Sequence, residues 1–390
     1  MLESNKTRWI VLALLFFARI GLGIQFQTLG SISTNLVDEL NLDYTEIGTL
    51  IGLFMVPGMF LSIPAGLSGR YASDRFIIGL GLMTLAAGSA LAAIASSFEL
   101  LALGRFICGV GFVFSTIFFT KMVADWFSGG NLALAMSILV TSWPTGIAMG
   151  QIGQGWVAAN YDWQLAFWVA SIYCFIGAWI VIIFCRDAPD AAQPTSGFRF
   201  TLSRAEIELT VYAALIWALF NSAYVLYLSF APSVLEVNGF DTLTALGIIS
   251  IASWMMIFTI SICGYISDRI GRPGLVIGVC MLAAMISMAL LIYTPFALSS
   301  TLLFGLAGIA PAGVIMSLTG SAMKAENRAF GMGLFFTIYF LFQAATPPIG
   351  GWLFDLSASA DWPIIFAIGL FAVTALVTYI FTVKARRNPI

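Results

Sequence analysis

Twelve long apolar runs divide the chain from one end to the other. Each can cross a bilayer as a helix, because about 20 apolar residues at 1.5 Å each span a hydrocarbon core of about 30 Å. The chain is 60% hydrophobic and only 9% charged, a balance that excludes a soluble domain. The expected spans are 9–36, 45–69, 76–97, 100–123, 132–158, 163–185, 207–231, 243–266, 274–294, 297–320, 328–354 and 363–383.

The gaps between the runs are short except for 186–206, which is polar and rich in Pro and Ser. Such composition is typical of a loop. We therefore expect an N-terminal six-helix bundle over 1–185, a linker over 186–206 and a C-terminal six-helix bundle over 207–390.

The cationic residues fix an expected orientation. Fifteen of the 17 Lys and Arg fall on the side of the N-terminus or at helix ends that face it, and the loops of the other side hold none. Positive loops are cytoplasmic in most membrane proteins, so we expect both termini inside the cell and the protein in the inner membrane.

The two halves share a sequence repeat. Under a shift of 196 residues, 131–156 aligns with 327–352 without gaps and keeps seven identities in 26 positions. This indicates a duplicated six-helix unit. Parallel repeats of this kind place a substrate site near the membrane midplane, where the halves meet.

Three loop or helix stretches then carry a family resemblance. Residues 264–273, Gly-Tyr-Ile-Ser-Asp-Arg-Ile-Gly-Arg-Pro, resemble the cytoplasmic loop motif of the major facilitator superfamily. Residues 66–75 resemble a degraded copy, with Arg70 where the motif has Asp. We expect either a weaker contact in the first half or that Asp74 takes the place of the missing Asp. Residues 104–111, Gly-Arg-Phe-Ile-Cys-Gly-Val-Gly, are similar to a pattern of the family's fourth helix.

The resemblance implies an all-α membrane protein with twelve transmembrane helices in two pseudo-symmetric bundles, working by rocker-switch alternating access. It also implies that the loop motif steadies one conformation, with gating residues Gly264, Asp268, Arg269, Gly271, Arg272, Arg70 and Asp74. The first helix and the Ser-Trp-Pro-Thr-Gly stretch at 142–146 resemble bacterial members of the cyanate/nitroimidazole and nitrate types.

Two arginines lie inside predicted helices. Arg19 is ten residues into the first span, about 15 Å deep. All 19 acidic residues lie in loops or at helix ends, so no carboxylate stands opposite this arginine at depth. A buried charge without a counter-ion is costly. We expect an anionic substrate to supply the counter-ion, although Arg19 could instead bond backbone carbonyls or Gln25 and Gln27.

Two further cations leave alternatives open. Arg105 lies about 8 Å from the outer end of its helix and could contact substrate, serve gating, snorkel outward or pair with Glu99. Lys121 is expected to be an anchor at the inner helix end, paired with Asp125 four residues on, with a second cavity cation as the alternative.

Polar and aromatic positions complete the predicted substrate site, although each could equally serve helix packing. The candidate binding residues are Arg19, Gln27, Arg105, Thr116, Asn221, Tyr224, Trp254, Tyr339 and Gln343.

Several functions are excluded by what the sequence lacks. Histidine is absent and the five cysteines have no CxxC spacing, so we expect no metal site and no cofactor. No nucleophile–base pair and no ATP-binding motif is present, which argues against an enzyme or a primary pump.

We therefore expect a secondary or facilitative transporter for a small, anionic solute. It should act as a monomer in the lipid bilayer, without nucleic acid. The alternatives are efflux of drug-like or hydrophobic compounds, and a non-transporting sensor or assembly factor on the same scaffold.

Overall fold

The computed structural model describes residues 2–68, 71–127, 131–188, 202–324 and 327–387. All regular elements in these residues are helices, which confirms the predicted all-α membrane class. Most of the predicted linker lies outside the described residues, as does Arg70. The chain forms two compact units, Met1–Leu42 with Leu53–Ser196, and Asp43–Gly52 with Gly197–Ile390.

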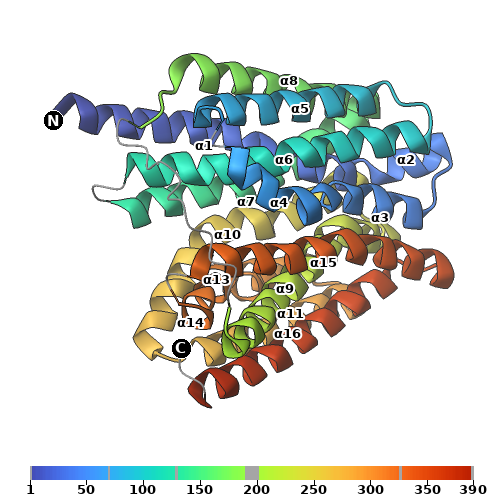
Figure 1. The fold of residues 1–390 in the computed structure, drawn as a ribbon. Helices are drawn as coiled ribbons and strands as arrows, with labels where there is room; N and C mark the ends of the chain where they lie inside the picture. The colour runs from blue at the N-terminus through green and yellow to red at the C-terminus, as the bar shows by residue number, and fades with distance from the viewer. Residues whose placement is uncertain (1, 69–70, 128–130, 189–201, 325–326, 388–390) are drawn as a thin grey trace. The chain divides into compact units, whose positions relative to one another are not determined.

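The first unit contains seven of the helices, and Figure 1 shows its five long ones running nearly parallel. Helix α1 packs on α7 and α8, while α5 packs on α6 and α8. The helices of this unit are α1 Leu2–Ser31, α2 Ser33–Leu40, α4 Val56–Ser68, α5 Asp74–Ala93, α6 Phe98–Trp126, α7 Leu132–Asn160 and α8 Trp163–Phe184.

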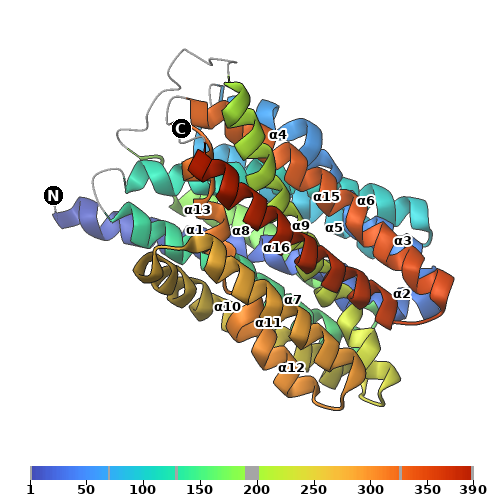
Figure 2. The ribbon, with the colours of Figure 1, turned by 90° about the horizontal axis from the view of Figure 1, so that it is seen from below.

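The second unit is built around α9, which packs on α15 and α16. Figure 2 shows α10, α11 and α12 side by side in this unit. Its elements are α3 Tyr44–Leu53, α9 Arg204–Val237, α10 Thr242–Ile270, α11 Pro273–Tyr293, α12 Ala297–Leu303, the π-helix η1 Phe304–Gly308, α13 Ala312–Ser317, α14 Thr319–Ala322, α15 Arg328–Ser357 and α16 Asp361–Arg387.

Eleven helical stretches in the described residues are long and apolar enough to span a membrane. The remaining expected span, 132–158, corresponds to the 29-residue α7. The repeat also appears in the helix boundaries, because the 196-residue shift carries Leu132, where α7 begins, onto Arg328, where α15 begins. The twelve predicted spans thus have helical counterparts.

Three predicted spans are interrupted, and prolines explain two of the breaks. Span 45–69 divides into α3 and α4 just before Pro57, and span 297–320 changes to a π-helix and then breaks at Pro311. Proline lacks the N–H that an α-helix needs and clashes with the carbonyl four residues earlier. Span 9–36 ends early, at Ser31, and a separate helix α2 follows.

Glycine pairs bring helices of the first unit into backbone contact. A Cβ placed on Gly88 would lie 2.6 Å from the carbonyl oxygen of Gly104, and one on Gly104 would lie 2.7 Å from that of Gly88. Gly111 approaches the carbonyl of Gly81 in the same way. The helix-four stretch that resembles the family pattern is therefore a packing surface between α6 and α5, as small residues often are in membranes.

Glycines also join α3 to α15 in the second unit. A Cβ on Gly351 would overlap the carbonyl oxygen of Tyr44, and one on Gly48 would overlap that of Pro347. Because both contacts are with backbone atoms, neither helix can yield by rotating a side chain.

The start of α3 is held by a carboxylate from α15. Asp355 accepts hydrogen bonds from the backbone N–H of Tyr44 at 3.0 Å and of Thr45 at 2.7 Å, and from the Thr45 hydroxyl at 2.6 Å. The first N–H groups of a helix have no partner inside it and carry partial positive charge, so a carboxylate is stabilising there. The Tyr44 ring stacks on Phe354 with centroids 3.6 Å apart.

We predict that Gly351→Ala lowers the unfolding temperature of the purified protein in detergent, because the added methyl group has no room beside the α3 backbone. Overpacking of this kind costs about 1–3 kcal/mol. The matched control is Gly369→Ala on α16, where no other atom lies within 4 Å of an added Cβ. Equal unfolding temperatures for the two variants would contradict the close contact between Gly351 and the α3 backbone.

Candidate functional site

Arg19 lies inside the first unit, in the interface of α1 with α7. Its side chain is 9% exposed, and its Nη1 donates to the Leu139 carbonyl at 2.8 Å and to Ser142 Oγ at 3.0 Å. Its buried Nε has no hydrogen-bond partner among the described residues. Within those residues no carboxylate lies within ion-pair distance of Arg19. The guanidinium is thus only partly satisfied by neutral oxygens.

The local sequence explains why Arg19 can reach α7. A Cβ on Gly23 would lie 2.6 Å from the Trp143 carbonyl oxygen and 2.8 Å from the Cα of Gly146. The two glycines therefore let α1 and α7 meet backbone to backbone, one turn beyond Arg19. Glycine has no side chain to separate the helices, which is why this approach is possible.

Arg105 has a different environment, although it is also buried. Its side chain is 0% exposed, and its Nη1 donates to the Gln25 carbonyl at 2.8 Å. The guanidinium lies over the Phe54 ring at 4.6 Å, a cation–π arrangement. The expectation that Arg105 could snorkel outward is wrong, because the side chain points into the bundle and supports the α1 backbone.

An aromatic cluster lies beside Arg105 and the α1–α7 contact. Trp143, which is partly exposed, has its ring 5.4 Å from that of Phe26 and 5.5 Å from that of Phe112. Phe54 lies 5.1 Å from Phe112 and 5.8 Å from Phe26. The unit therefore offers an apolar, aromatic surface next to the residue that bonds Arg19.

The other predicted positions of the first unit are buried polar groups. Gln27 is 2% exposed and its Nε2 has no hydrogen-bond partner among the described residues. Thr116 Oγ1, on α6, is likewise buried without a partner there. Buried polar atoms are normally hydrogen-bonded, so each of these needs an explanation such as water or a ligand.

Predicted positions in the second unit bond neighbouring helices. The Tyr224 hydroxyl on α9 lies 2.7 Å from Ser253 Oγ on α10. Gln343 on α15 donates from Nε2 to Ser222 Oγ on α9 at 3.4 Å. These bonds fit the packing interpretation of both residues.

The remaining three positions are more open. Asn221 is partly exposed and donates to the Trp217 carbonyl of its own helix at 2.8 Å. Tyr339 has its ring 6.2 Å from that of Trp217, and Trp254 is 39% exposed. The second unit therefore presents aromatic and amide groups without a buried cation at these positions.

The 264–273 motif forms the tight connection from α10 to α11. Gly271 ends α10 in the left-handed conformation, with φ at 64°, which glycine adopts without strain. Arg269 lies 5.2 Å from the Tyr265 ring, and Asp268 and Arg272 are exposed. Gly264 faces open space, since nothing lies within 4 Å of an added Cβ.

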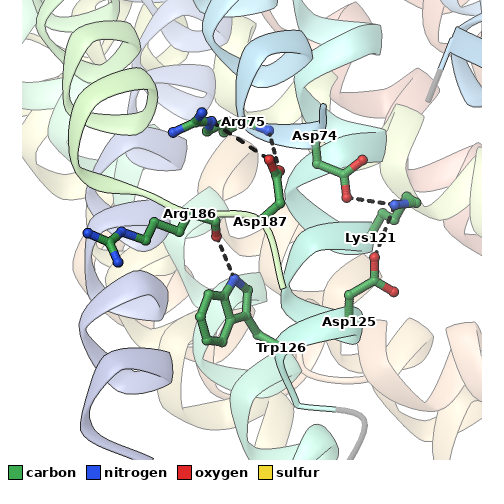
Figure 3. Close-up of polar contacts among 7 residues, drawn as sticks. All are labelled: Asp74, Arg75, Lys121, Asp125, Trp126, Arg186 and Asp187. Atoms are coloured by element: carbon green, nitrogen blue, oxygen red, sulfur yellow. Dashed lines mark hydrogen bonds and ion pairs between the residues drawn. The ribbon is translucent and has the colours of Figure 1, made fainter. Parts of the chain in front are cut away.

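The corresponding end of the first unit carries an ion-pair cluster, shown in Figure 3. Lys121 lies between two carboxylates, with Nζ 2.6 Å from Asp74 and 3.0 Å from Asp125. The predicted pairing of Lys121 with Asp125 is thus confirmed. Asp74 is only 6% exposed, although it is the first residue of α5 and follows a loop. The cluster ties the start of α5 to the end of α6.

A second contact in Figure 3 fixes the chain after α8 to the same place. Asp187 accepts from the Arg75 backbone N–H at 3.1 Å and lies 3.7 Å from Arg75 Nε. Trp126 Nε1 donates to the Arg186 carbonyl at 2.8 Å. The first residues of the predicted linker are therefore bound to the first unit.

Neither unit offers a metal centre in the part of the chain that the structure describes, where no three His, Cys, Asp or Glu residues gather.

The sequence profile of the Major Facilitator Superfamily matches residues 14–341. The chain belongs to this superfamily. Its fold agrees, because a bacterial homolog of the human lysosomal transporter Spinster, in an inward-facing and unoccupied conformation, superposes with a TM-score of 0.80 at 15% identity, over 98% of each chain. This membership makes the protein a transporter by family rather than an enzyme.

Curated relatives are similar at low identity. The 3-(3-hydroxy-phenyl)propionate transporter of Escherichia coli is 23% identical, over 85% of this chain and 83% of its own length. Multidrug resistance protein 1 of Bacillus subtilis is 25% identical over 48% of this chain, and the match spans 47% of that relative. The family model thus establishes the superfamily, and the relatives within it are transporters of different compounds.

Two polar residues of the first unit were not among the site residues predicted from the sequence. Ser142 is the side-chain partner of Arg19, and Gln154 is a buried glutamine on α7. The signal for Ser142 is its place in the Ser-Trp-Pro-Thr-Gly stretch. Gln154 carries no signal of its own, since only the packing of α7 shows that it is enclosed.

We predict that Lys121→Met destabilises the protein by about 1–3 kcal/mol, because the Asp74 carboxylate is then left enclosed without a cation. This is less than the 3–5 kcal/mol of a fully buried pair, since the Lys121 side chain is 32% exposed. Thermal unfolding in detergent measures the effect. Asp125→Asn should cost less, because Lys121 keeps Asp74, and Lys121→Arg should largely restore stability. A Lys121→Met protein that melts like the wild type would contradict the cluster's role.

Proposed function

We propose that the protein carries a small organic anion across the inner membrane by alternating access, as a monomer with both termini in the cytoplasm. Arg19 binds the anion. The observation that carries the proposal is the half-satisfied guanidinium of Arg19. Within the residues that the structure describes, its Nε has no hydrogen-bond partner and no carboxylate lies within ion-pair distance.

The physical argument concerns the cost of this charge. A guanidinium near the midplane costs about 2.5–3.5 kcal/mol on insertion scales. The Leu139 carbonyl and Ser142 offset part of this cost through one nitrogen. The fork of a guanidinium suits a carboxylate, which accepts two parallel hydrogen bonds and supplies the missing charge.

Similarity supports the same substrate class. The Escherichia coli relative is named for 3-(3-hydroxy-phenyl)propionate, which is a carboxylate, and it aligns over most of both chains. We assign Arg105 to the support of α1 rather than to a second binding charge, because its Nη1 already bonds the Gln25 carbonyl and its side chain has no exposed surface.

The expected coupling is uniport, anion exchange, or symport in which the proton rides on the substrate. The chain has no histidine, and its acidic residues lie in loops or at helix ends. Within the described residues the buried acids are Asp74 and Glu206, and both stand in the first turn of their helices.

Efflux of drug-like compounds is the second candidate, and the match to Multidrug resistance protein 1 favours it. It predicts that neutral or cationic hydrophobic compounds bind better than carboxylates, and that loss of Arg19 leaves their transport intact.

The test is counterflow in proteoliposomes with a panel of small carboxylates. We expect Arg19→Gln to reduce exchange at least about 10-fold, because one charge-assisted hydrogen-bond pair is worth about 1.5–3 kcal/mol. Arg8→Gln, a change at the inner end of the same helix, is the control and should keep exchange. Unchanged carboxylate exchange in Arg19→Gln would overturn the anion proposal and leave drug efflux as the better candidate.

A further inference from the structure

A second set of unsatisfied polar groups lies on α1, the helix that carries Arg19, and on α7, the helix that Arg19 contacts. Gln27 Nε2 on α1 and Gln154 Oε1 on α7 are buried and have no hydrogen-bond partner among the described residues, and each residue is 2% exposed. One is a donor and the other is an acceptor. A hydroxyl group can satisfy both, because it accepts one hydrogen bond and donates another.

The packing of α1 on α7 places the two amides at neighbouring levels. A Cβ on Gly150 would lie 3.1 Å from the Cβ of Gln27, and Gln154 follows Gly150 by one helical turn on the same face. Ser31, one turn after Gln27, donates to the Gly150 carbonyl at 3.2 Å. Both glutamines therefore belong to one stretch of the interface.

This stretch lies further along α1 than Arg19. Gln27 follows Arg19 by eight residues, about 12 Å along the helix axis. A three- or four-atom inorganic anion such as nitrate or cyanate can meet the guanidinium but cannot also reach the amides. A molecule that satisfies both ends must have two polar ends.

Between the two ends, Gly23 and Gly146 bring the helix backbones into contact, and an aromatic surface lies beside this contact. Trp143 is the residue next to Ser142, and its partly exposed ring lies against Phe26, which itself precedes Gln27. A flat apolar body can stack on such rings. The order along this side of the two helices is therefore the cation, an aromatic surface and the two amides.

We propose that the substrate is an aromatic carboxylate bearing a hydroxyl group, with its carboxylate at Arg19 and Ser142, its ring beside Trp143, and its hydroxyl between Gln27 and Gln154. This rests on the proposed function and narrows it. It makes Gln154 a specificity residue and excludes small inorganic anions as the preferred cargo.

The test compares two ligands that differ by one hydroxyl, 3-phenylpropionate and 3-(3-hydroxyphenyl)propionate. Their dissociation constants are measured by calorimetry on the full-length protein in detergent. The wild type should bind the hydroxylated compound about 3- to 10-fold more tightly, the effect of a neutral hydrogen bond. Gln27→Met and Gln154→Met should bind the two compounds equally, while keeping the wild-type affinity for 3-phenylpropionate.

Matched controls separate this inference from the proposed function. Gln164→Met on α8 also removes a buried amide oxygen without a described partner, and it should keep the hydroxyl preference. Arg19→Gln should weaken both ligands alike. If a Met variant binds neither ligand, Gln27→Asn and Gln154→Asn, which keep an amide on a shorter side chain, repeat the comparison.

Several results would overturn the inference. A hydroxyl preference that survives in the Gln27 and Gln154 variants, while Arg19→Gln loses both ligands, removes the amide site and leaves the anion proposal standing. A wild type that binds the two compounds equally, or neither at millimolar concentration, removes the two-ended substrate. Binding that is indifferent to Arg19→Gln removes the proposed function itself.

Discussion

A positive charge enclosed by helices must be compensated, and much of the first unit can be understood from that requirement. Arg19 and Arg105 are both buried arginines in apolar helices. Their desolvation must be repaid by hydrogen bonds or by an opposite charge. Arg105 obtains carbonyl oxygens of α1 and the face of Phe54. Arg19 obtains one carbonyl and one hydroxyl, and its Nε has no hydrogen-bond partner in the described part of the chain. The same residue type is thus fully enclosed against the α1 backbone in one place and only partly hydrogen-bonded in the other.

Glycine contacts make this arrangement possible. Gly23 and Gly146 bring α1 and α7 together beside Arg19, and Gly88 and Gly104 bring α5 and α6 together beside Arg105. In lipid there is no hydrophobic drive between apolar helices, so close backbone approach and interhelical hydrogen bonds supply the attraction. The same principle holds α3 to α15, where Gly351 meets the α3 backbone.

Charged residues at the ends of the helices have different partners from those in the middle of the helices. Lys121 is shared by Asp74 and Asp125, and Asp187 caps the start of α5 through the Arg75 N–H. Each of these groups has a charged or backbone partner in the chain itself. Ion pairs at helix ends therefore fasten elements together. Arg19 differs, because within the described residues its Nε has no hydrogen-bond partner and no carboxylate lies within ion-pair distance. The proposed ligand role of Arg19 depends on this difference.

The sequence by itself determined the class, the helical spans, the repeat and the superfamily, because these follow from apolar length, loop motifs and a fixed residue shift. It also singled out Arg19, since the acids could be sorted by position alone, and it predicted the Lys121–Asp125 pair, since four residues make one helical turn. The tertiary structure alone decided the different environments of Arg19 and Arg105 and the enclosure of Gln154. The physical reason is that burial and hydrogen-bond supply depend on which backbone carbonyl a neighbouring helix presents, and residue spacing within one helix carries no information about that neighbour.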